Sequence, residues 1–382
     1  MQEPGTRIPF VENKPLDLVQ IGQILQLSHR ASQWANFGPV SKLLERFIGA
    51  HLNIPDDRAV VMCASGTAAL NAIAAAHAME AGRHLRWAVS SYGFLCTNTG
   101  PFADAIVLDC DDEGLLSLDL LKALEPDTCD GVVVTNTFGL HPGLQKHLAL
   151  CREKKLRVVV DNAAALHGYD REGSPVDEFA SFHQTKPWGM GEGGCAIVSR
   201  ALEPLVRSFL NFGVGLSSFP RDLAANGKIS DLACAAIFSR LITQGEWALL
   251  YRSQARRIAE IGVASGFELL GHPDFGATIP AHVALLAPIE IPRTALENPW
   301  CALQKYYKPL AATENARRIY ARVLNVPCHP GMKTLADSHI TAMLQTVLRN
   351  ATRAKDHSTT TAEVSIAQCS ENQATCSSTR SG

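Results

Sequence analysis

The 382-residue sequence predicts an α/β protein whose mainly parallel sheet is covered by helices on both faces. Two observations lead to this fold class. Over the first 245 residues, short apolar runs of strand length alternate with segments of helical periodicity. Beyond residue 245, helical patterns surround a stretch that contains Pro and Gly, which indicates a smaller α+β domain. We therefore predict a large domain over residues 1–245 and a small C-terminal domain over residues 246–350.

Continuous apolar runs mark the expected strands, because strands buried on both faces need no polar alternation. The runs lie at residues 59–63, 87–89, 105–108, 131–134, 156–160 and 195–198. Helical patterns lie at 67–76, 118–124 and 144–150, and then at 247–261, 313–324 and 340–348. From 351 to 382 the sequence is dominated by small polar, amide and charged residues, so this tail is predicted to be disordered.

Charge and cysteine usage restrict the class of ligand. With 35 basic and 37 acidic residues, the net charge of −2 provides no attraction for nucleic acid or an acidic membrane. No apolar run is long enough to cross a membrane, and the N-terminus lacks a signal-peptide pattern. The 11 cysteines and 13 histidines show no spacing typical of zinc sites or disulfide frameworks. We expect a cytoplasmic protein that binds a small molecule, without nucleic-acid, membrane or metal partners.

The segment from Ser181 to Lys186 places one lysine between a hydroxyl-rich approach and a glycine-rich exit at residues 189–194. A lysine in this setting suits a Schiff base with a carbonyl cofactor such as pyridoxal 5'-phosphate (PLP). The Ser181 hydroxyl would donate to the phosphate of the cofactor. The glycines have no side chains, so their backbone would leave room for the cofactor ring. Taken alone, Ser181 is equally compatible with a turn cap and Lys186 with a solvated surface lysine.

Other candidate residues follow the predicted strands. Ser65-Gly66-Thr67 stands where a strand meets a helix, and a helix N-terminus favours phosphate; an ordinary helix cap is the alternative. Asp161 ends a strand and would pair with the pyridine nitrogen of PLP, or else form a turn. Phe94 would stack on the ring, or else belong to the core. Together, in this order along the chain, these residues predict a PLP site.

In these motifs the sequence resembles the DegT/StrS-type sugar aminotransferases, which are PLP enzymes of fold type I (aspartate aminotransferase-like). The resemblance covers about residues 8–349, and its most specific motif is the lysine segment. The matching segments are Phe37-Gly38-Pro39 with Glu45, Ser65 to Leu70, Phe138-Gly139, Val159 to Ala164, Ser181 to Gly194, Asn226 to Asp231, Tyr306 to Leu310 and Leu324 to Gly331. The resemblance implies a large domain with a sheet of the seven-stranded type.

The resemblance also implies the chemistry. PLP is expected as a covalent internal aldimine with Lys186, which then carries the proton between substrate and cofactor, while Asp161 balances the charge on the ring. An amino acid, usually glutamate, would be the donor and a nucleotide-linked keto-sugar the acceptor. The product would serve a surface polysaccharide or a secondary metabolite. Relatives that dehydrate sugars carry histidine at the lysine position, so Lys186 favours amine transfer.

A homodimer with shared active sites is the implied assembly, in which Asn226 contacts the cofactor of the partner and Lys228 its substrate. Further substrate candidates are His183, Tyr307 and His329, although His183 is equally compatible with a structural role.

The chain departs from the family pattern at two of these positions. Ala164 belongs to the cofactor set by position but replaces a Gln or His, and Lys228 replaces the commoner Arg. Two alternatives stay open: a PLP enzyme of the same fold with another substrate or dehydratase-like chemistry, and a PLP-binding regulator without turnover.

Overall fold

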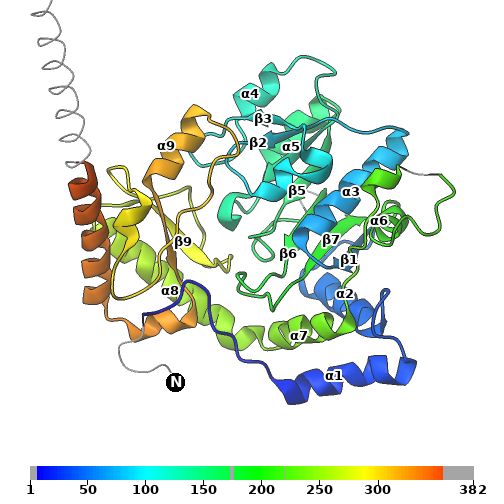
Figure 1. Ribbon diagram of the computed structural model, residues 1–382, viewed down its shortest axis with the longest axis horizontal. Helices are drawn as coiled ribbons and strands as arrows, with labels where there is room; N and C mark the ends of the chain where they lie inside the picture. The colour runs from blue at the N-terminus through cyan, green and yellow to red at the C-terminus, as the bar shows by residue number, and fades with distance from the viewer. Residues whose placement is uncertain (1–6, 173–175, 219, 356–382) are drawn as a thin grey trace, which may run out of the picture.

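The computed structural model describes residues 7–172, 176–218 and 220–355, and it contains one seven-stranded and one three-stranded sheet. The large sheet has the strand order β1-β7-β6-β5-β4-β2-β3, in which β7 alone runs antiparallel to its two neighbours (Figure 1). Its strands are β1 (Arg58–Cys63), β2 (Trp87–Ser90), β3 (Ile106–Leu108), β4 (Gly131–Thr135), β5 (Arg157–Asp161), β6 (Asp177–Ser181) and β7 (Gly194–Ser199). The predicted α/β fold with a mainly parallel sheet is confirmed.

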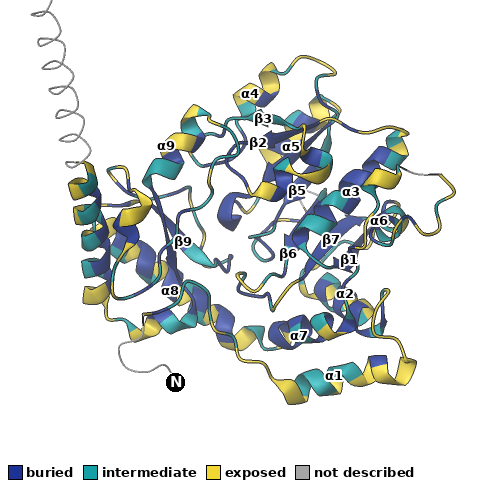
Figure 2. Ribbon diagram, viewed as in Figure 1, coloured by how far each residue is buried: buried dark blue, intermediate teal, exposed yellow. Residues whose placement is uncertain are grey.

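Helices cover both faces of the large sheet, which explains why most of its strands are largely apolar. Val133 and Val159 pack in one cluster with the helix α3 (Gly66–Ala81), whereas their neighbours Val132 and Val160 pack on the opposite face. That opposite face is covered by α2 (Pro39–His51), α4 (Leu118–Ala123), α5 (Gln145–Glu153) and α7 (Asp231–Ile242), while α6 (Glu203–Phe209) packs beside α3. In Figure 2 most of the strand residues are dark blue, the colour of buried residues, and the strands lie between the helices.

The C-terminal part of the chain, residues 244–355, contains α8 (Gln244–Ala264) and an antiparallel sheet ordered β10-β9-β8. These strands are β8 (Glu268–Leu269), β9 (His282–Leu286) and β10 (Val323–Pro327), and α9 (Glu314–Arg322) precedes β10. The helix predicted at 313–324 is therefore too long: it ends at Arg322, because Val323, Leu324 and Val326 are buried in the sheet. The predicted boundary at residue 245 lies at the junction of α7 and α8, and the division into two domains stays a prediction.

A final helix runs from residue 337 to the last described residue, 355. It thus extends five residues into the segment predicted as a disordered tail, and Ala351 on it packs in the core. The remainder of the predicted tail, 356–382, lies outside the described residues. No helix in the described part of the chain has the length and apolarity needed to span a membrane.

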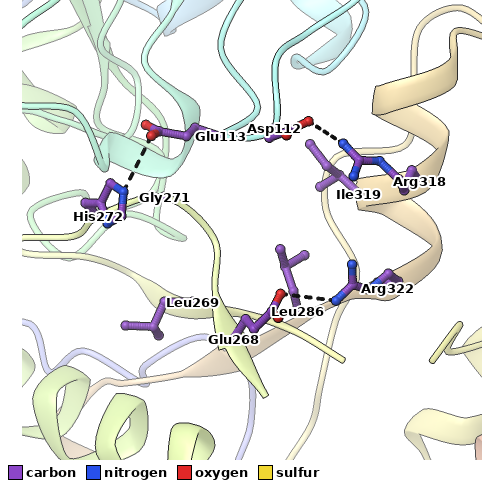
Figure 3. Close-up of a pocket in the computed structure, with 10 residues that line it drawn as sticks. All are labelled: Asp112, Glu113, Glu268, Leu269, Gly271, His272, Leu286, Arg318, Ile319 and Arg322. Carbon is purple, nitrogen blue, oxygen red and sulfur yellow. Dashed lines mark hydrogen bonds and ion pairs between the residues drawn. The ribbon is translucent and has the colours of Figure 1, made fainter. Parts of the chain in front are cut away.

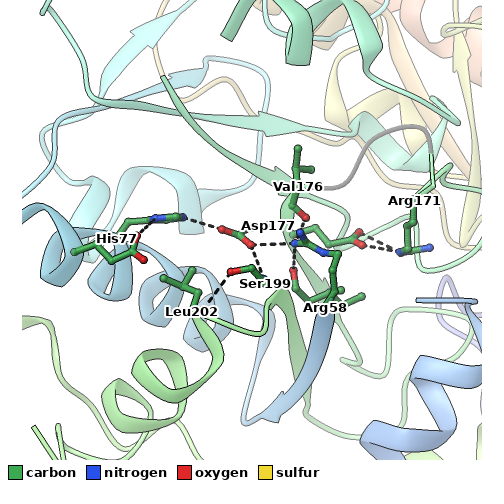
Figure 4. Close-up of polar contacts among 10 residues, drawn as sticks. Arg58, His77, Arg171, Val176, Asp177, Ser199 and Leu202 are labelled. Carbon is green, nitrogen blue, oxygen red and sulfur yellow. Dashed lines mark hydrogen bonds and ion pairs between the residues drawn. The ribbon is translucent and has the colours of Figure 1, made fainter. Parts of the chain in front are cut away.

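The sequence analysis missed the strand β6, whose first two residues are acidic. Asp177 pairs with Arg58 at 3.0 Å and forms a hydrogen bond with the Nε2 atom of His77 at 2.9 Å, and Glu178 pairs with Arg171 at 2.6 Å (Figure 4). Removing one partner of such a buried pair lowers the free energy of unfolding by about 3–5 kcal/mol. These ion pairs allow a strand that begins with two carboxylates to occupy the interior of a sheet.

The N-terminal arm, residues 7–17, connects the two parts of the molecule. Ile8 pairs with the C-terminal part, since its N–H donates to Trp300 O at 2.9 Å and its carbonyl accepts from Ala302 N at 2.8 Å. The chain then crosses to α1 (Leu18–Ala31), which lies along α7 (Figure 1). A second connection comes from Asp109, after β3, whose carboxylate accepts from the N–H groups of Asn315 and Ala316 at the start of α9.

Candidate active site

A cavity of about 390 Å³ opens where the carboxyl ends of β1, β5 and β6 meet the C-terminal part. Ligands of open α/β sheets bind at this edge. The large sheet and the loops after it supply most of the lining, and β9, the Tyr306-Tyr307 segment and the N-terminal arm supply the rest. The lining residues include Phe10, Ser65, Gly66, Thr67, Phe94, Phe138, Asp161, Ala164, Ser181, His183, Lys186, His282, Tyr306 and Tyr307.

One end of the cavity contains a helix N-terminus, a feature that favours phosphate binding. Ser65 is the N-cap of α3, and its hydroxyl accepts from Ala68 N at 3.1 Å. The helix begins at Gly66, so the first N–H groups of the helix and the Thr67 hydroxyl adjoin the cavity. A Cβ atom at Gly66 would lie 3.3 Å from the Cβ atom of Ser181, so glycine lets Ser181 approach the helix terminus closely. Ser65 therefore both caps the helix and lines the cavity.

Asp161 is the last residue of β5 and only 3% exposed, and its carboxylate accepts from Ala163 N at 2.9 Å. Burial raises the pKa of Asp161 to about 6, and the Ala163 N–H and the charge of Lys186 oppose this rise. Burial likewise lowers the pKa of Lys186, against the influence of Asp161. The lysine and the carboxylate are therefore electrostatically coupled in one cavity. A lowered pKa favours the neutral amine, which is the form that attacks a carbonyl group.

Aromatic rings form the wall between these polar ends. Tyr307 stacks on Phe138 with 4.7 Å between ring centroids, and Phe94 meets Tyr307 edge to face at 6.4 Å. Phe94 is 53% exposed, so it is not the core aromatic that its neighbourhood in the sequence also allowed. The hydroxyl of Tyr92 donates to Tyr306 O at 2.6 Å and holds this wall against the large sheet.

His282, at the start of β9, is a lining residue that the sequence analysis missed. The Asn325 side chain fixes its tautomer: Oδ1 of Asn325 accepts from Tyr306 N at 2.7 Å, so Nδ2 donates to Nδ1 of His282 at 3.1 Å. The proton of the imidazole then resides on Nε2. Burial and the nearby Lys186 lower the pKa of His282 to about 3, which makes the ring a neutral hydrogen-bond donor. The only signal in the sequence was a histidine before an apolar run.

Three predicted site residues lie outside the cavity lining. The Lys228 ammonium donates to Oδ1 of Asn226 and of Asn211, each at 2.7 Å, and lies 4.7 Å from the ring centroid of Phe212. His329 is buried, where its Nε2 atom donates to Pro9 O at 2.9 Å and its Nδ1 atom accepts from Gly331 N at 3.2 Å. The single chain therefore gives His329 a structural contact with the N-terminal arm.

The fold brings the remaining predicted site residues to the main cavity. Tyr307, Ala164 and His183 all line the cavity. The Nδ1 atom of His183 is engaged with Thr185, whose N–H it accepts at 3.2 Å, and its Nε2 atom lies 3.5 Å from Glu192. The methyl group of Ala164 offers no hydrogen bond. The functional roles assigned to all of these residues stay predictions.

A second cleft, of about 350 Å³, lies between the large sheet and the C-terminal part (Figure 3). Three ion pairs surround it: Asp112 with Arg318, Glu113 with His272 at 3.6 Å, and Glu268 with Arg322 at 3.2 Å. The first two pairs cross between the two parts of the molecule. We interpret this cleft as a polar junction that joins the two parts, because its charges are paired with one another.

The donor set of the main cavity fits PLP. The cofactor needs an amine for its aldehyde, an anion for its pyridine nitrogen and donors for its phosphate. Lys186 would supply the amine, Asp161 the anion, and the α3 terminus with Thr67 and Ser181 the donors. The close approach that Gly66 permits keeps these donors within one site.

Fold and site together define an α/β protein of PLP fold type I. The chain belongs to the DegT/DnrJ/EryC1/StrS aminotransferase family, whose model matches residues 20–260. This match confirms the predicted family.

A curated relative, Protein Rv3402c of Mycobacterium tuberculosis H37Rv, is 29% identical over 268 residues, which are 63% of this chain and 62% of that protein. Among solved structures, DesI in the presence of its TDP-sugar product has a TM-score of 0.75 and 21% identity, covering 93% of this chain and 95% of that one. PseC of Helicobacter pylori, an aminotransferase involved in pseudoaminic acid biosynthesis, has a TM-score of 0.72 and 16% identity, covering 91% and 100%. At these identities the two structures show a shared fold.

Proposed function

We propose that this protein is a PLP-dependent aminotransferase that moves the amino group of an amino acid, in the simplest case glutamate, to a nucleotide-linked keto-sugar. The observation that carries the proposal is the placement of Lys186, Asp161 and the N-terminus of α3 around one cavity. A family model of aminotransferases supports it.

When bound, PLP supplies an electron sink for the carbon that loses a proton. The residues of the chain hold and orient it: the α3 terminus and its hydroxyls bind the phosphate, and Asp161 keeps the pyridine nitrogen protonated. The amine of Lys186 would remove the proton at the α-carbon of the amino donor and would deliver a proton to the carbon of the acceptor that receives the amino group. The aromatic wall of Phe138 and Tyr307 limits the access of water to this amine.

Assembly as a homodimer with shared sites is part of the proposal. Among the described residues, no arginine lines the cavity, yet a carboxylate donor such as glutamate calls for a cation. Lys228 lies outside the cavity of its own chain, where it contacts Asn226, Asn211 and Phe212, and in a dimer it would contribute to the cavity of the partner. Exposed apolar side chains support such a contact, because Phe94 lies at the cavity and Phe212 beside Lys228.

Complementation tests the shared site. The Lys186→Ala variant lacks the amine and the Lys228→Ala variant lacks the donated cation, so each homodimer should be inactive. Mixed after dissociation, the two variants should recover up to about a quarter of wild-type activity, because only mixed dimers contain an intact site. Activity that stays at zero, or a monomer by light scattering, would contradict the shared site while leaving the cofactor chemistry untouched.

Amino-group transfer is tested in two halves. Purified protein with PLP should convert the cofactor to its pyridoxamine form when glutamate is added, as seen in its absorbance spectrum. The converted protein, mixed with a panel of nucleotide keto-sugars, should yield an amino sugar detected by mass spectrometry. Bound cofactor that no amino donor converts would instead identify a PLP-binding regulator, and conversion without any sugar product would identify another acceptor.

We propose a cytoplasmic location and a role in making amino sugars for a surface polysaccharide or a secondary metabolite. All nine cysteines in the described part of the chain are free and buried, which is typical of proteins in a reducing compartment. Fractionation of the source cells, and loss of the amino sugar on gene deletion, test these two points.

A further inference from the structure

We propose that Lys14 of the N-terminal arm is a positioning residue for Lys186. The proposal rests on the function proposed above and adds to it a residue remote from Lys186 in the sequence. Lys14 reaches the loop after β6 from outside the cavity and binds the backbone on which Lys186 is mounted.

The loop that holds Lys186 has no helix or strand, and its own amides leave several carbonyl groups without partners inside the loop. The N–H of Lys186 donates to His183 O at 2.9 Å, and that of Gly189 donates to Lys186 O at 3.0 Å. The carbonyl groups of Gln184 and Gly189 face the arm instead. Partly buried carbonyl groups need a donor, so a loop of this kind depends on its surroundings for a defined conformation.

Lys14 supplies these donors. Its Nζ atom lies 2.7 Å from Gln184 O, 2.5 Å from Lys186 O and 2.9 Å from Gly189 O. An ammonium group has three N–H bonds, and each has one carbonyl oxygen to donate to. Pro15 follows Lys14 and favours an extended backbone at that position, which suits an arm that lies across the loop.

A second cation completes the support. The guanidinium of Arg240, on α7, donates to Pro187 O at 3.0 Å and pairs with Glu12 at 2.6 Å. Glu12 thus balances charge between the two cations. Burial and the charge of Arg240 lower the pKa of Lys14 to about 7 while Glu12 opposes them, and the three carbonyl oxygens favour the charged form that offers three donors.

The arm that carries Lys14 is itself anchored in the C-terminal part. His329 holds Pro9 O at 2.9 Å, Ile8 pairs with Trp300, and the ring of Phe10 lines the cavity next to His282. Through Lys14, a chain of contacts therefore joins the C-terminal part of the cavity wall to the backbone of Lys186. Since displacement of a reacting group by about 1 Å can cost a hundredfold in rate, this connection bears directly on the chemical step.

The test compares Lys14→Met, which keeps the length of the side chain without its donors, with Lys14→Arg and with the exposed control Lys122→Met. The first readout needs no amino-group transfer: the rate at which PLP added to the apoprotein becomes fixable to Lys186 by borohydride, followed by mass spectrometry. We expect Lys14→Met to slow this rate at least tenfold, Lys14→Arg to restore part of it, and Lys122→Met to match the wild type.

The second readout is the half-reaction with glutamate, where Lys14→Met should lower the limiting rate at least tenfold and change the apparent Kd of glutamate less than threefold. If Lys14→Met does not fold, Lys14→Gln, which keeps part of the donor set, replaces it. Wild-type rates of PLP fixation in the folded variant would overturn the role of Lys14. A wild-type protein that fixes PLP but transfers no amino group would overturn the proposed function and leave the first readout valid.

Discussion

Replacing Asp161 by Asn removes one negative charge from the cavity while almost preserving the shape of the side chain. Asp161 is 3% exposed, so the pyridine nitrogen that it faces would also be buried. Leaving one partner of a buried ion pair alone costs about 3–5 kcal/mol, which corresponds to about 100- to 3000-fold at about 1.4 kcal/mol per tenfold. The nitrogen can avoid this cost by losing its proton. We therefore expect PLP to bind about 10- to 100-fold more weakly and turnover to fall by about 1000-fold.

The pH dependence provides the sharper measurement. Burial raises the pKa of Asp161 to about 6, against the Ala163 N–H and Lys186. Below that pH the carboxyl is protonated and cannot neutralise the ring nitrogen, so the affinity for PLP should fall as the pH drops from 7 to 5, by up to about tenfold per unit. The Asp161→Asn variant has no carboxyl to titrate and should show a flatter profile.

Non-covalent affinity is best measured in a Lys186→Ala background, so that the covalent link does not contribute. Equilibrium dialysis of PLP from pH 5 to 8 gives the dissociation constant for each variant, and Asp104→Asn, on the exposed surface, is the control. The role assigned to Asp161 would be refuted if, at pH 7.5, adding Asp161→Asn to the Lys186→Ala variant changed the dissociation constant of PLP less than threefold. Parallel pH profiles of the two variants would refute it as well.

Three further predictions concern other parts of the molecule. Borohydride should fix no PLP to Lys186→Ala, and covalent label found on this variant by mass spectrometry would reject the lysine assignment. Changing His282 to Phe should lower kcat/KM for the acceptor at least tenfold, and His282→Gln, which keeps a donor, should retain more activity; equal losses would exclude a donor role. Asp109→Ala should reduce the free energy of unfolding by about 1–2 kcal/mol in urea titrations, because α9 loses its cap. Despite partial burial, which acts the other way, hydrogen bonds from Asn315 and Thr313 hold the pKa of Asp109 below its usual value. The stabilisation by Asp109 is therefore present above about pH 4 and is lost as the pH falls further, and a pH-independent effect would contradict it.

Local sequence patterns predicted the site residues that the large sheet contributes. A strand buried on both faces appears as a continuous apolar run, and the residue after it lies at the ligand-binding edge. Asp161 and Ser65 were found in this way, at the ends of β5 and β1. The strand β6 was not predicted because Asp177 and Glu178 look like loop residues as long as their partners are unknown. Arg58, the partner of Asp177, is distant in the sequence, and Arg171 lies seven residues before Glu178 in a segment that was not assigned to a strand.

The other half of the site depends on contacts that no local pattern records. His282 reaches the cavity only because β9 pairs with β10, and its tautomer depends on Asn325 of that neighbouring strand. Lys14 lies 172 residues from Lys186 in the sequence, and a lysine before a proline carries no local signal of its partner. Resemblance to a family placed Asn226 and Lys228 in the site, and in a single chain they lie outside it, as residues that serve a partner would.

This division of the site has a chemical meaning. The groups expected to bind PLP come from strand ends and the α3 terminus, whose positions are set by the packed sheet. The groups that we expect to face the acceptor, such as Tyr307 and His282, belong to segments attached to the sheet by a few hydrogen bonds, among them Tyr92 to Tyr306 O and Leu310 N to Ser91 O. A change of acceptor therefore requires changes in the second set alone. The choice of sugar should be sought in residues 277–310, and substitutions there should alter acceptor preference without changing the rate at which Lys186 takes up PLP.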